Sequence, residues 1–299
     1  MKMNSFFKVA GHVFEVKLND DASPLFFASM DNYAPFKLES VDGLPLAFSL
    51  EIFTENVRVD FVEETRQVDE GQEIICGKNA ESLPTFEFLL GGKSTGVLVC
   101  HDEFQSGSLY VNGTLPAHFQ KFALNNSLMV LYALATSCKN TVLFHSAVIA
   151  RENRGYMFLG KSGTGKSTHA RMWLRRFSNA DLLNDDNPVV RLEEDGVWVY
   201  GTPWSGKTPC YKNSRVPLAG IVNLSQAPQN KIRPIKGIEA YMALVVSISG
   251  MRWDKKVADG LHATENRLAQ EVKMFHLECL PDENAAEVCY GAFTEVSAQ

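Results

Sequence analysis

The sequence has few cysteines, and none of them are closely paired. Its six cysteines are spread over 299 residues without C-x-x-C spacing. They are Cys76, Cys100, Cys138, Cys210, Cys279 and Cys289. Disulfide frameworks and structural zinc sites need paired or regularly spaced cysteines, so we interpret these residues as buried free thiols. A weaker alternative is a metal site made of His276, Cys279 and Cys289.

A long apolar run is also lacking. The N-terminal stretch MKMNSFFKVAGHVF has no apolar segment of signal-peptide length, and the most hydrophobic stretch, SLMVLYALATSC, is too short to cross a bilayer. Internal repeats and low-complexity tracts are missing. Hydrophobic residues make up 45% of the chain and charged residues 21%, values typical of a globular protein. We therefore expect a cytoplasmic protein with no membrane partner.

The chain has no excess of basic charge, because its formal net charge is −6. Residues 1–116 carry 18 acidic and 8 basic side chains, a balance of −10 that leaves +4 for the remainder. Seven of the cations lie between His145 and Arg176, against one acid. Short, dispersed cations in an acidic chain make a poor nucleic-acid surface. We expect no nucleic-acid partner, and a small phosphorylated molecule matches this charge better.

Two domains are expected from the change of pattern along the chain. Residues 1–116 read as short alternating strands separated by turn residues, which predicts an antiparallel β domain. From Ala117 the spacing of apolar residues is helical, and we place a second domain at 117–299. In that domain TVLFHSAVIA and YMFLG are expected strands, and IEAYMALVVSISG and KVADGLHATENRLAQEV are expected helices. The predicted fold class is α/β.

The phosphate-loop pattern G-x-x-x-x-G-K-[ST] occurs twice, as GKSGTGKS at 160–167 and GTPWSGKT at 201–208. The first copy stands between an expected strand and an expected helix, the context that such a loop needs in order to cradle phosphates with its backbone amides. In the second copy Pro203 removes a donor, Trp204 adds bulk, and the following residues are poor helix formers. We interpret the second copy as a candidate active-site loop that does not cradle a nucleotide.

The first loop supplies the expected nucleotide-binding residues. They are Gly160, Ser162, Gly163, Thr164, Gly165, Lys166, Ser167 and Thr168. Lys166 is expected to reach the β and γ phosphates of ATP, and the Ser167 hydroxyl is expected to bind Mg²⁺. Near the second loop, Lys207 and Arg215 are candidates for holding a substrate.

Two adjacent acids follow the first loop. Asp185 and Asp186 end the apolar stretch in DLLNDDNPVV, 19 residues after Lys166 in the case of Asp185. The segment between Lys166 and Asp185 is long enough only for the helix that follows the loop. Neighbouring carboxylates at a strand end beside a phosphate site can divide two tasks, ordering Mg²⁺ and accepting the proton of a hydroxyl. The plainer alternative is an Asx turn, which accounts for one of the two acids.

The order HSAV, GKSGTGKST and LLNDDNPVV resembles the HPr kinase/phosphorylase family, whose P-loop core is shared with ATP-dependent phosphoenolpyruvate carboxykinase. The likeness covers about residues 141–235 and includes a histidine 15 residues before the loop, which here is His145. It implies a phosphoenolpyruvate-carboxykinase-like core, ATP and Mg²⁺ as cofactors, and Asp185 as the acid/base toward a serine hydroxyl. Asp186 would help to hold the metal, and His145 would lie beside the phosphates or the metal.

The chain departs from HPr kinases just before GIVNL, where the glutamate is missing and Arg215 is displaced. We therefore expect a kinase of this type that phosphorylates a protein or peptide other than HPr. The alternatives are a small-molecule kinase on the same core and a nucleotide-sensing module without catalysis. Because HPr kinases are oligomers, the resemblance also implies a homo-oligomer as one alternative for this chain.

Overall fold

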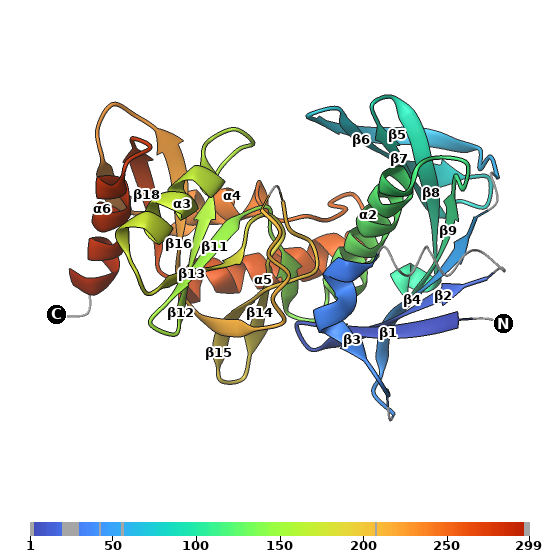
Figure 1. Cartoon of the computed structure of the whole chain (residues 1–299), viewed down its shortest axis with the longest axis horizontal. Helices are drawn as coiled ribbons and strands as arrows, with labels where there is room; N and C mark the ends of the chain where they lie inside the picture. Colours follow the sequence, from blue (N-terminus) through green and yellow to red (C-terminus); the bar gives the residue numbers. More distant parts are fainter. Residues whose placement is uncertain (1–2, 20–29, 42, 55–56, 207, 296–299) are drawn as a thin grey trace. The chain divides into compact units, whose positions relative to one another are not determined.

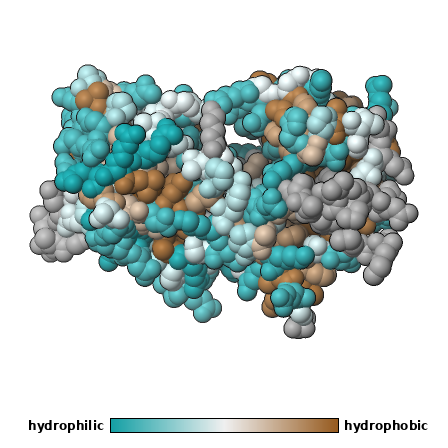
Figure 2. Space-filling view, viewed as in Figure 1, coloured by the Kyte–Doolittle hydropathy of each residue, from teal (hydrophilic) through white to brown (hydrophobic). Residues whose placement is uncertain are grey.

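The computed structural model describes residues 3–19, 30–41, 43–54, 57–206 and 208–295 (Figure 1). The chain divides into two compact units, Met1–Thr136 and Ser137–Gln299, each built on a large mixed sheet. The fold is mixed α/β and largely β. Among the described residues, no helix has the length and apolarity to cross a membrane. Hydrophilic residues cover most of the face seen in Figure 2.

The first unit contains nine strands and one long helix among its described residues. In chain order the elements are β1 Met3–Val9, β2 His12–Leu18, η1 Asp31–Phe36, β3 Lys37–Leu38, β4 Leu46–Phe53, β5 Phe61–Asp69, β6 Gln72–Asn79, β7 Pro84–Leu90, β8 Lys93–His101, η2 Asp102–Phe104, β9 Ser106–Val111 and α2 Ala117–Thr136. The strand order is β3-β1-β2-β4-β9-β8-β7-β6-β5.

The prediction of an antiparallel sheet in this unit is confirmed only in part, because the sheet is mixed. Most neighbours are antiparallel, but β4 is parallel to both β2 and β9. Parallel neighbours need a long crossover, and the segment between Leu18 and Leu46 and the β5–β8 meander supply two such connections. The alternating pattern of a strand does not reveal the direction of its neighbour.

Helix α2 belongs to the first unit, so the boundary lies later than the predicted residue 116. The helix packs on β4, β7, β8 and β9, as Figure 1 shows. Leu128 and Leu131 are fully buried, and the Tyr132 hydroxyl donates to the carbonyl of Val9 at 3.1 Å. The apolar face of α2 therefore completes the core of the first sheet.

The second unit is also a helix-covered sheet. Its elements are β10 Thr141–Leu143, β11 Ala147–Arg151, β12 Arg154–Leu159, α3 Lys166–Arg176, β13 Ala180–Asn184, β14 Val189–Glu193, β15 Gly196–Tyr200, β16 Arg215–Gln226, β17 Lys231–Pro234, α4 Gly237–Val245, α5 Lys255–Glu271, β18 Met274–Cys279 and α6 Glu283–Glu295. The strand order is β10-β14-β15-β16-β12-β11-β13, and β18 pairs with β16 and β17.

The segment TVLFHSAVIA forms two strands, although its composition predicts one. The chain leaves β10 at Leu143, and β11 begins at Ala147 in another part of the sheet. Phe144 bridges to Ile248, and the amide of His145 donates to the carbonyl of Ser247 at 2.7 Å. These bonds turn the chain between the two strands and place His145 at the edge of the sheet.

Helices α3 and α6 pack against one face of the second sheet through an aromatic core. Trp173 on α3 is fully buried, and its ring centroid lies 4.8 Å from that of Tyr156 and 5.6 Å from that of Phe158. Its indole Nε1 donates to Nε2 of His169 at 3.1 Å. Burial lowers the pKa of His169 from its ordinary value of 6.5 to about 4. The imidazole is therefore neutral at physiological pH.

We expect His169→Gln to flatten the acid limb of the stability profile. A lowered folded-state pKa means that stability is fully present above pH 6.5 and is lost as the pH falls toward 4. The difference corresponds to about 3 kcal/mol at most. Urea unfolding at pH 7 and pH 4.5 measures the difference, with His262→Gln as the control because His262 is an exposed residue of α5. Equal losses in wild type and His169→Gln would contradict the assignment.

Candidate active site at one edge of the second sheet

Strand directions bring the predicted site residues to one edge of the second sheet. Strand β11 lies between β12 and β13 and is antiparallel to both. The carboxyl ends of β12 and β13 therefore meet the amino end of β11. Ala147 pairs with Phe158, and Val148 pairs with Asn184. The first loop, the paired acids and His145 follow or precede these positions by one to three residues.

The first loop has the strand–loop–helix context that the sequence predicts. It leaves β12 at Leu159 and enters α3 at Lys166, and Gly165 is the N-cap with φ +108°. Gly163 has φ +78°, and a Cβ atom there would meet open space. Both conformations favour glycine, and they let the backbone of the loop come close to a ligand.

Lys166 folds back over the loop. It is 9% exposed, and its Nζ donates to the carbonyl of Gly160 at 2.9 Å and to that of Lys161 at 3.4 Å. Gln226, at the end of β16, braces the loop from the other side, because its Nε2 donates to the carbonyls of Gly163 and Thr164 at 3.3 Å. Gln226 was missed by sequence reasoning, since it lies about 60 residues away and belongs to no local motif.

The remaining loop residues lie in the loop itself and in the first turn of α3. Ser162 is exposed within the loop, and the amide of Thr164 donates to the carbonyl of Lys161 at 3.1 Å. Ser167 and Thr168 begin α3 and are partly exposed, and Thr168 Oγ1 accepts from Arg171 at 3.2 Å. The positive end of the helix dipole lies at this loop and favours an anion there.

Asp186 is held from three sides. Its Oδ1 lies 3.3 Å from Nδ1 of His145, its Oδ2 accepts from Asn187 at 2.7 Å, and its carbonyl accepts from the Ser146 amide at 2.8 Å. Burial raises the pKa of Asp186 above its ordinary value, and the charges of His145 and Lys166 work in the opposite direction.

Asp185 is more buried than its neighbour, at 7% exposed. Within the part of the chain that the structure describes, its carboxylate makes no hydrogen bond or ion pair. Its negative charge contributes to the raised pKa of Asp186. The two acids therefore differ in environment, because Asp186 is tied to His145 and Asn187 while Asp185 keeps its acceptor capacity.

The second phosphate-loop match lies directly beside the acids. A Cβ atom on Gly206 would stand 3.2 Å from Cβ of Asp186 and 3.4 Å from the carbonyl of Asp185. The Asn184 amide anchors the loop by donating to Thr202 Oγ1 at 3.0 Å and to the Trp204 carbonyl at 3.3 Å. The residues between this loop and β16 form no helix. The segment therefore lacks the loop–helix architecture of a phosphate-binding loop. It instead packs against Asp185 and Asp186 at the edge of the sheet.

Of the two residues predicted to hold a substrate near this loop, the structure describes only Arg215. Lys207 lies outside the described residues. The Arg215 guanidinium donates to Glu193 at 2.6 Å and to the Tyr200 hydroxyl at 2.8 Å, and it stacks on Trp198 at 4.0 Å. These contacts give Arg215 a structural role between β14, β15 and β16, and a role toward substrate stays a prediction.

The oxygen donors at this edge fit Mg²⁺ better than a transition metal. The Ser167 hydroxyl and the Asp186 carboxylate are hard oxygen ligands, which Mg²⁺ prefers together with phosphate oxygens. No group of three or more His, Cys, Asp and Glu side chains is gathered for a metal anywhere in the described ranges. In the alternative metal site, His276 instead bonds to the Ser225 hydroxyl at 3.1 Å, and Cys289 is buried in the core.

Comparison of the sequence with known proteins finds no relative. The sequence matches no protein-family model and no curated protein. The likeness to HPr kinases therefore rests on the motifs alone and stays a prediction. The positions of the loop and the acids at the sheet edge are observed in the structure and do not depend on that likeness.

We expect Asp186→Asn to stabilise the protein at pH 8. A raised pKa means that ionising the folded carboxyl costs free energy, so the cost is present at high pH and vanishes below the ordinary value of 3.8. Because the side chain is partly exposed, we expect a modest rise of about 2 °C in the unfolding midpoint. Thermal unfolding at pH 8 and pH 3.5 tests this expectation. A variant less stable than wild type at pH 8 would show that the carboxylate is a structural anchor.

Proposed function

We propose that the unit Ser137–Gln299 is an ATP- and Mg²⁺-dependent phosphotransferase of the HPr kinase type, with a phosphoenolpyruvate-carboxykinase-like core. It transfers the γ-phosphate of ATP to a hydroxyl, most simply a serine hydroxyl of a protein or peptide. The observation that carries the proposal is the meeting of a glycine-rich loop with the buried Asp185 and the half-buried Asp186 at one sheet edge.

The loop and α3 supply binding and charge neutralisation. The amides of the loop and the first turn of α3 point their partial positive charge toward the triphosphate. Lys166 exchanges its present bonds to the carbonyls of Gly160 and Lys161 for phosphate oxygens. Phosphoryl transfer depends mainly on such positioning and electrostatic stabilisation.

Ser167 and Asp186 would hold Mg²⁺, which neutralises phosphate charge and orients the triphosphate when it is bound. His145 positions the Asp186 carboxylate, since its Nδ1 lies 3.3 Å from Oδ1. Asn187 fixes the other oxygen of the same carboxylate by donating to it at 2.7 Å. The two neighbours thus fix the orientation of this ligand before any ion arrives.

Asp185 is the group suited to accept the proton of the substrate. Its carboxylate is not engaged by the described residues, and it lies next to the proposed metal ligand. As the acceptor oxygen bonds to the γ-phosphorus, its proton passes to Asp185 and ADP leaves with the β–γ bridging oxygen. Residues 201–206 lie beside the two acids. The substrate that carries the accepting hydroxyl would bind against this segment.

We expect Asp185→Asn to abolish phosphoryl transfer while changing the affinity for Mg-ATP by only a few-fold. A general base contributes about 10²–10⁴-fold to rate, and this variant removes the proton acceptor while leaving the phosphate loop intact. Transfer is measured with labelled ATP and separate protein and metabolite fractions of a cell extract. Affinity is measured by calorimetry.

The matched control is Asp259→Asn, an exposed acid of α5 that pairs with Lys255. It should retain wild-type transfer. Label in the metabolite fraction would identify a small-molecule kinase. Tight Mg-ATP binding by wild type with no transfer or ATP turnover would refute the phosphotransferase and favour a nucleotide sensor.

Gly206→Ala is expected to reduce transfer by about tenfold without loss of stability. The new Cβ would stand 3.2 Å from Cβ of Asp186, closer than an ordinary contact, so the acid must move by a few tenths of an ångström. Small displacements of catalytic groups have large kinetic effects. The control is Gly291→Ala on α6, where a Cβ meets open space. Unchanged transfer in Gly206→Ala would show that the second loop does not constrain the acids.

A further inference from the structure

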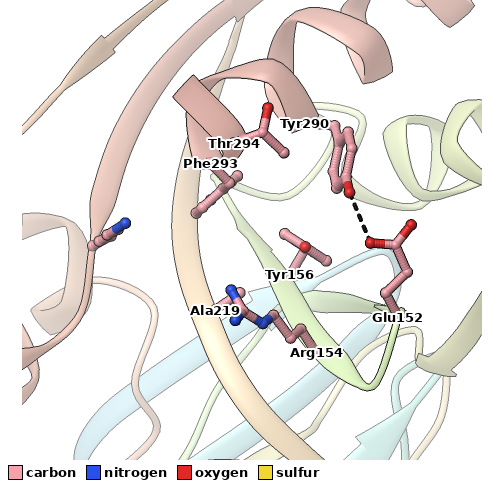
Figure 3. Close-up of a pocket in the computed structure, with 8 residues that line it drawn as sticks. Glu152, Arg154, Tyr156, Ala219, Tyr290, Phe293 and Thr294 are labelled. Atoms are coloured by element: carbon pink, nitrogen blue, oxygen red, sulfur yellow. Dashed lines mark hydrogen bonds between the residues drawn. The ribbon is translucent and has the colours of Figure 1, made fainter. Parts of the chain in front are cut away.

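A cavity at the start of β12 offers a ligand little contact surface. Its volume is about 440 Å³, and Figure 3 shows it between β12 and α6. Tyr156 and Phe293 in its lining are buried and pack on each other in the core. Glu152 already accepts a hydrogen bond from the Tyr290 hydroxyl at 2.9 Å, which the dashed line in the figure marks. The opposite situation holds on helix α4, whose apolar side chains lie open to solvent.

Helix α4 carries apolar residues on both of its faces. Ala240 and Leu244 are fully buried, and the helix packs on α5, which is labelled beside it in Figure 1. On the outward face Ile238, Met242 and the C-cap residue Val246 follow one another at four-residue spacing and are 75%, 50% and 73% exposed. They form a row about 12 Å long on one side of the helix. We call these three residues the α4 stripe.

The outward face of α4 has almost no charge of its own. Glu239 is the only charged residue of the helix, and its carboxylate is engaged by Arg233, which donates to it at 2.9 and 2.5 Å. A helix that is apolar all round is normally buried. Single exposed apolar residues are ordinary, whereas three in one row on such a helix indicate a surface that another chain covers.

A groove lies beside the N-terminal end of the stripe, between α4 and α5, and holds a cavity of about 340 Å³. Ile238 and Tyr241 line it from α4, and the exposed His262 and the half-buried Ala269 line it from α5. The Tyr241 hydroxyl is hydrogen-bonded to Nδ1 of His262 at 2.8 Å and donates to the buried Glu265 at 3.2 Å. These bonds tie the two helices together, so the groove is present before a partner binds.

Lys236 gives this surface its charge. It is the N-cap of α4, it is exposed, and with the described residues its side chain forms no hydrogen bond or ion pair. The positive end of the dipole of α4 lies at the same place. The neighbouring charges of Arg233 and Glu239 compensate each other. An acidic group is therefore the favoured neighbour at this end of the stripe.

We propose that the α4 stripe binds a short amphipathic helix of a partner protein, which has apolar side chains one turn apart and an acidic residue opposite Lys236. A helix suits the surface because rows of side chains four residues apart interlock on facing helices. An apolar side chain of the partner fills the cavity beside Ile238. The proposal goes beyond phosphoryl transfer and does not rest on it.

A second copy of the chain fits the stripe less well. Two α4 helices packed face to face would set Lys236 opposite either another Lys236 or residues 246–251, which are uncharged. The stripe is also small, because a stable dimer buries about 800 Å² on each partner through about 20–30 residues. Two helical turns instead match a short segment of a partner protein.

The test is fluorescence anisotropy of the full chain, without nucleotide, with three labelled alanine-based peptides of about 16 residues, which are long enough to form helices in water. The acidic probe has leucines one turn apart and glutamate on its flanks. The basic probe has lysine in place of glutamate, and the polar probe has glutamine in place of leucine.

Saturable one-to-one binding is expected for the acidic probe. The basic probe should bind about fivefold more weakly, because it meets Lys236 with a like charge. The polar probe should bind at least tenfold more weakly, because it buries no apolar side chain. Equal affinities for the three probes would overturn the proposal, as would the absence of saturable binding of the acidic probe.

A pair of variants locates the binding surface. Ile238→Gln/Val246→Gln should weaken binding of the acidic probe about tenfold, because it removes both ends of the stripe. The matched control Val62→Gln/Val68→Gln replaces two similarly exposed residues of β5 and should leave the affinity unchanged. All four side chains are exposed, so circular dichroism should show wild-type folding. If Ile238→Gln/Val246→Gln binds the acidic probe as tightly as wild type, the probe binds elsewhere and the assignment is wrong.

Lys236→Glu tests the charge of the partner. The acidic probe should lose affinity and the basic probe should gain it, so that the order of the two probes is reversed. An unchanged order would refute the acidic partner. If light scattering shows a wild-type dimer that Ile238→Gln/Val246→Gln converts to a monomer, a second copy covers the stripe and the proposal is wrong.

Discussion

The position of β11 between β12 and β13 is the constraint on which the candidate site depends. Because β11 runs antiparallel to both neighbours, their carboxyl ends must lie at the same edge. A phosphate loop and an acidic pair that are 19 residues apart in sequence thus meet across one strand. The pairing of β11 with β13 shifts register between Val148 and Ile149, and this shift places Asn184 opposite Val148. Asn184 then bonds to the second loop and to the Asp186 amide.

Electrostatics at this edge oppose folding stability. Asp185 is buried and Asp186 is half-buried, and the nearby charges of His145 and Lys166 offset only part of the desolvation of Asp186, so its pKa stays raised. A protein selected for stability alone has no need of adjacent buried acids. A carboxyl with a raised pKa, beside a cation and a glycine-rich loop, is a feature that occurs often at functional sites.

Local patterns predicted the local parts of the fold. The strand–loop–helix around Lys166, the helices α4 and α5 and most strands of the first unit follow from apolar spacing, glycine and turn residues. Non-local pairing was not predictable, because direction and register depend on partners far away in sequence. The split of TVLFHSAVIA at Phe144, the parallel pairing of β4 and the bracing of the loop by Gln226 are of this kind. Helix α6 was missed although Ala286, Cys289 and Phe293 stand at helical spacing.

Strand β12 and helix α3 fix the phosphate loop against a dense core. Strand β12 carries the phosphate loop at one end and Arg154 at the other, and α3 runs from Lys166 to a buried Trp173 that touches Tyr156. Trp173, Phe158 and Tyr156 are at most 3% exposed and close-packed, which leaves no room for a second arrangement. The core therefore holds both ends of β12, and with them the start of the phosphate loop, in place.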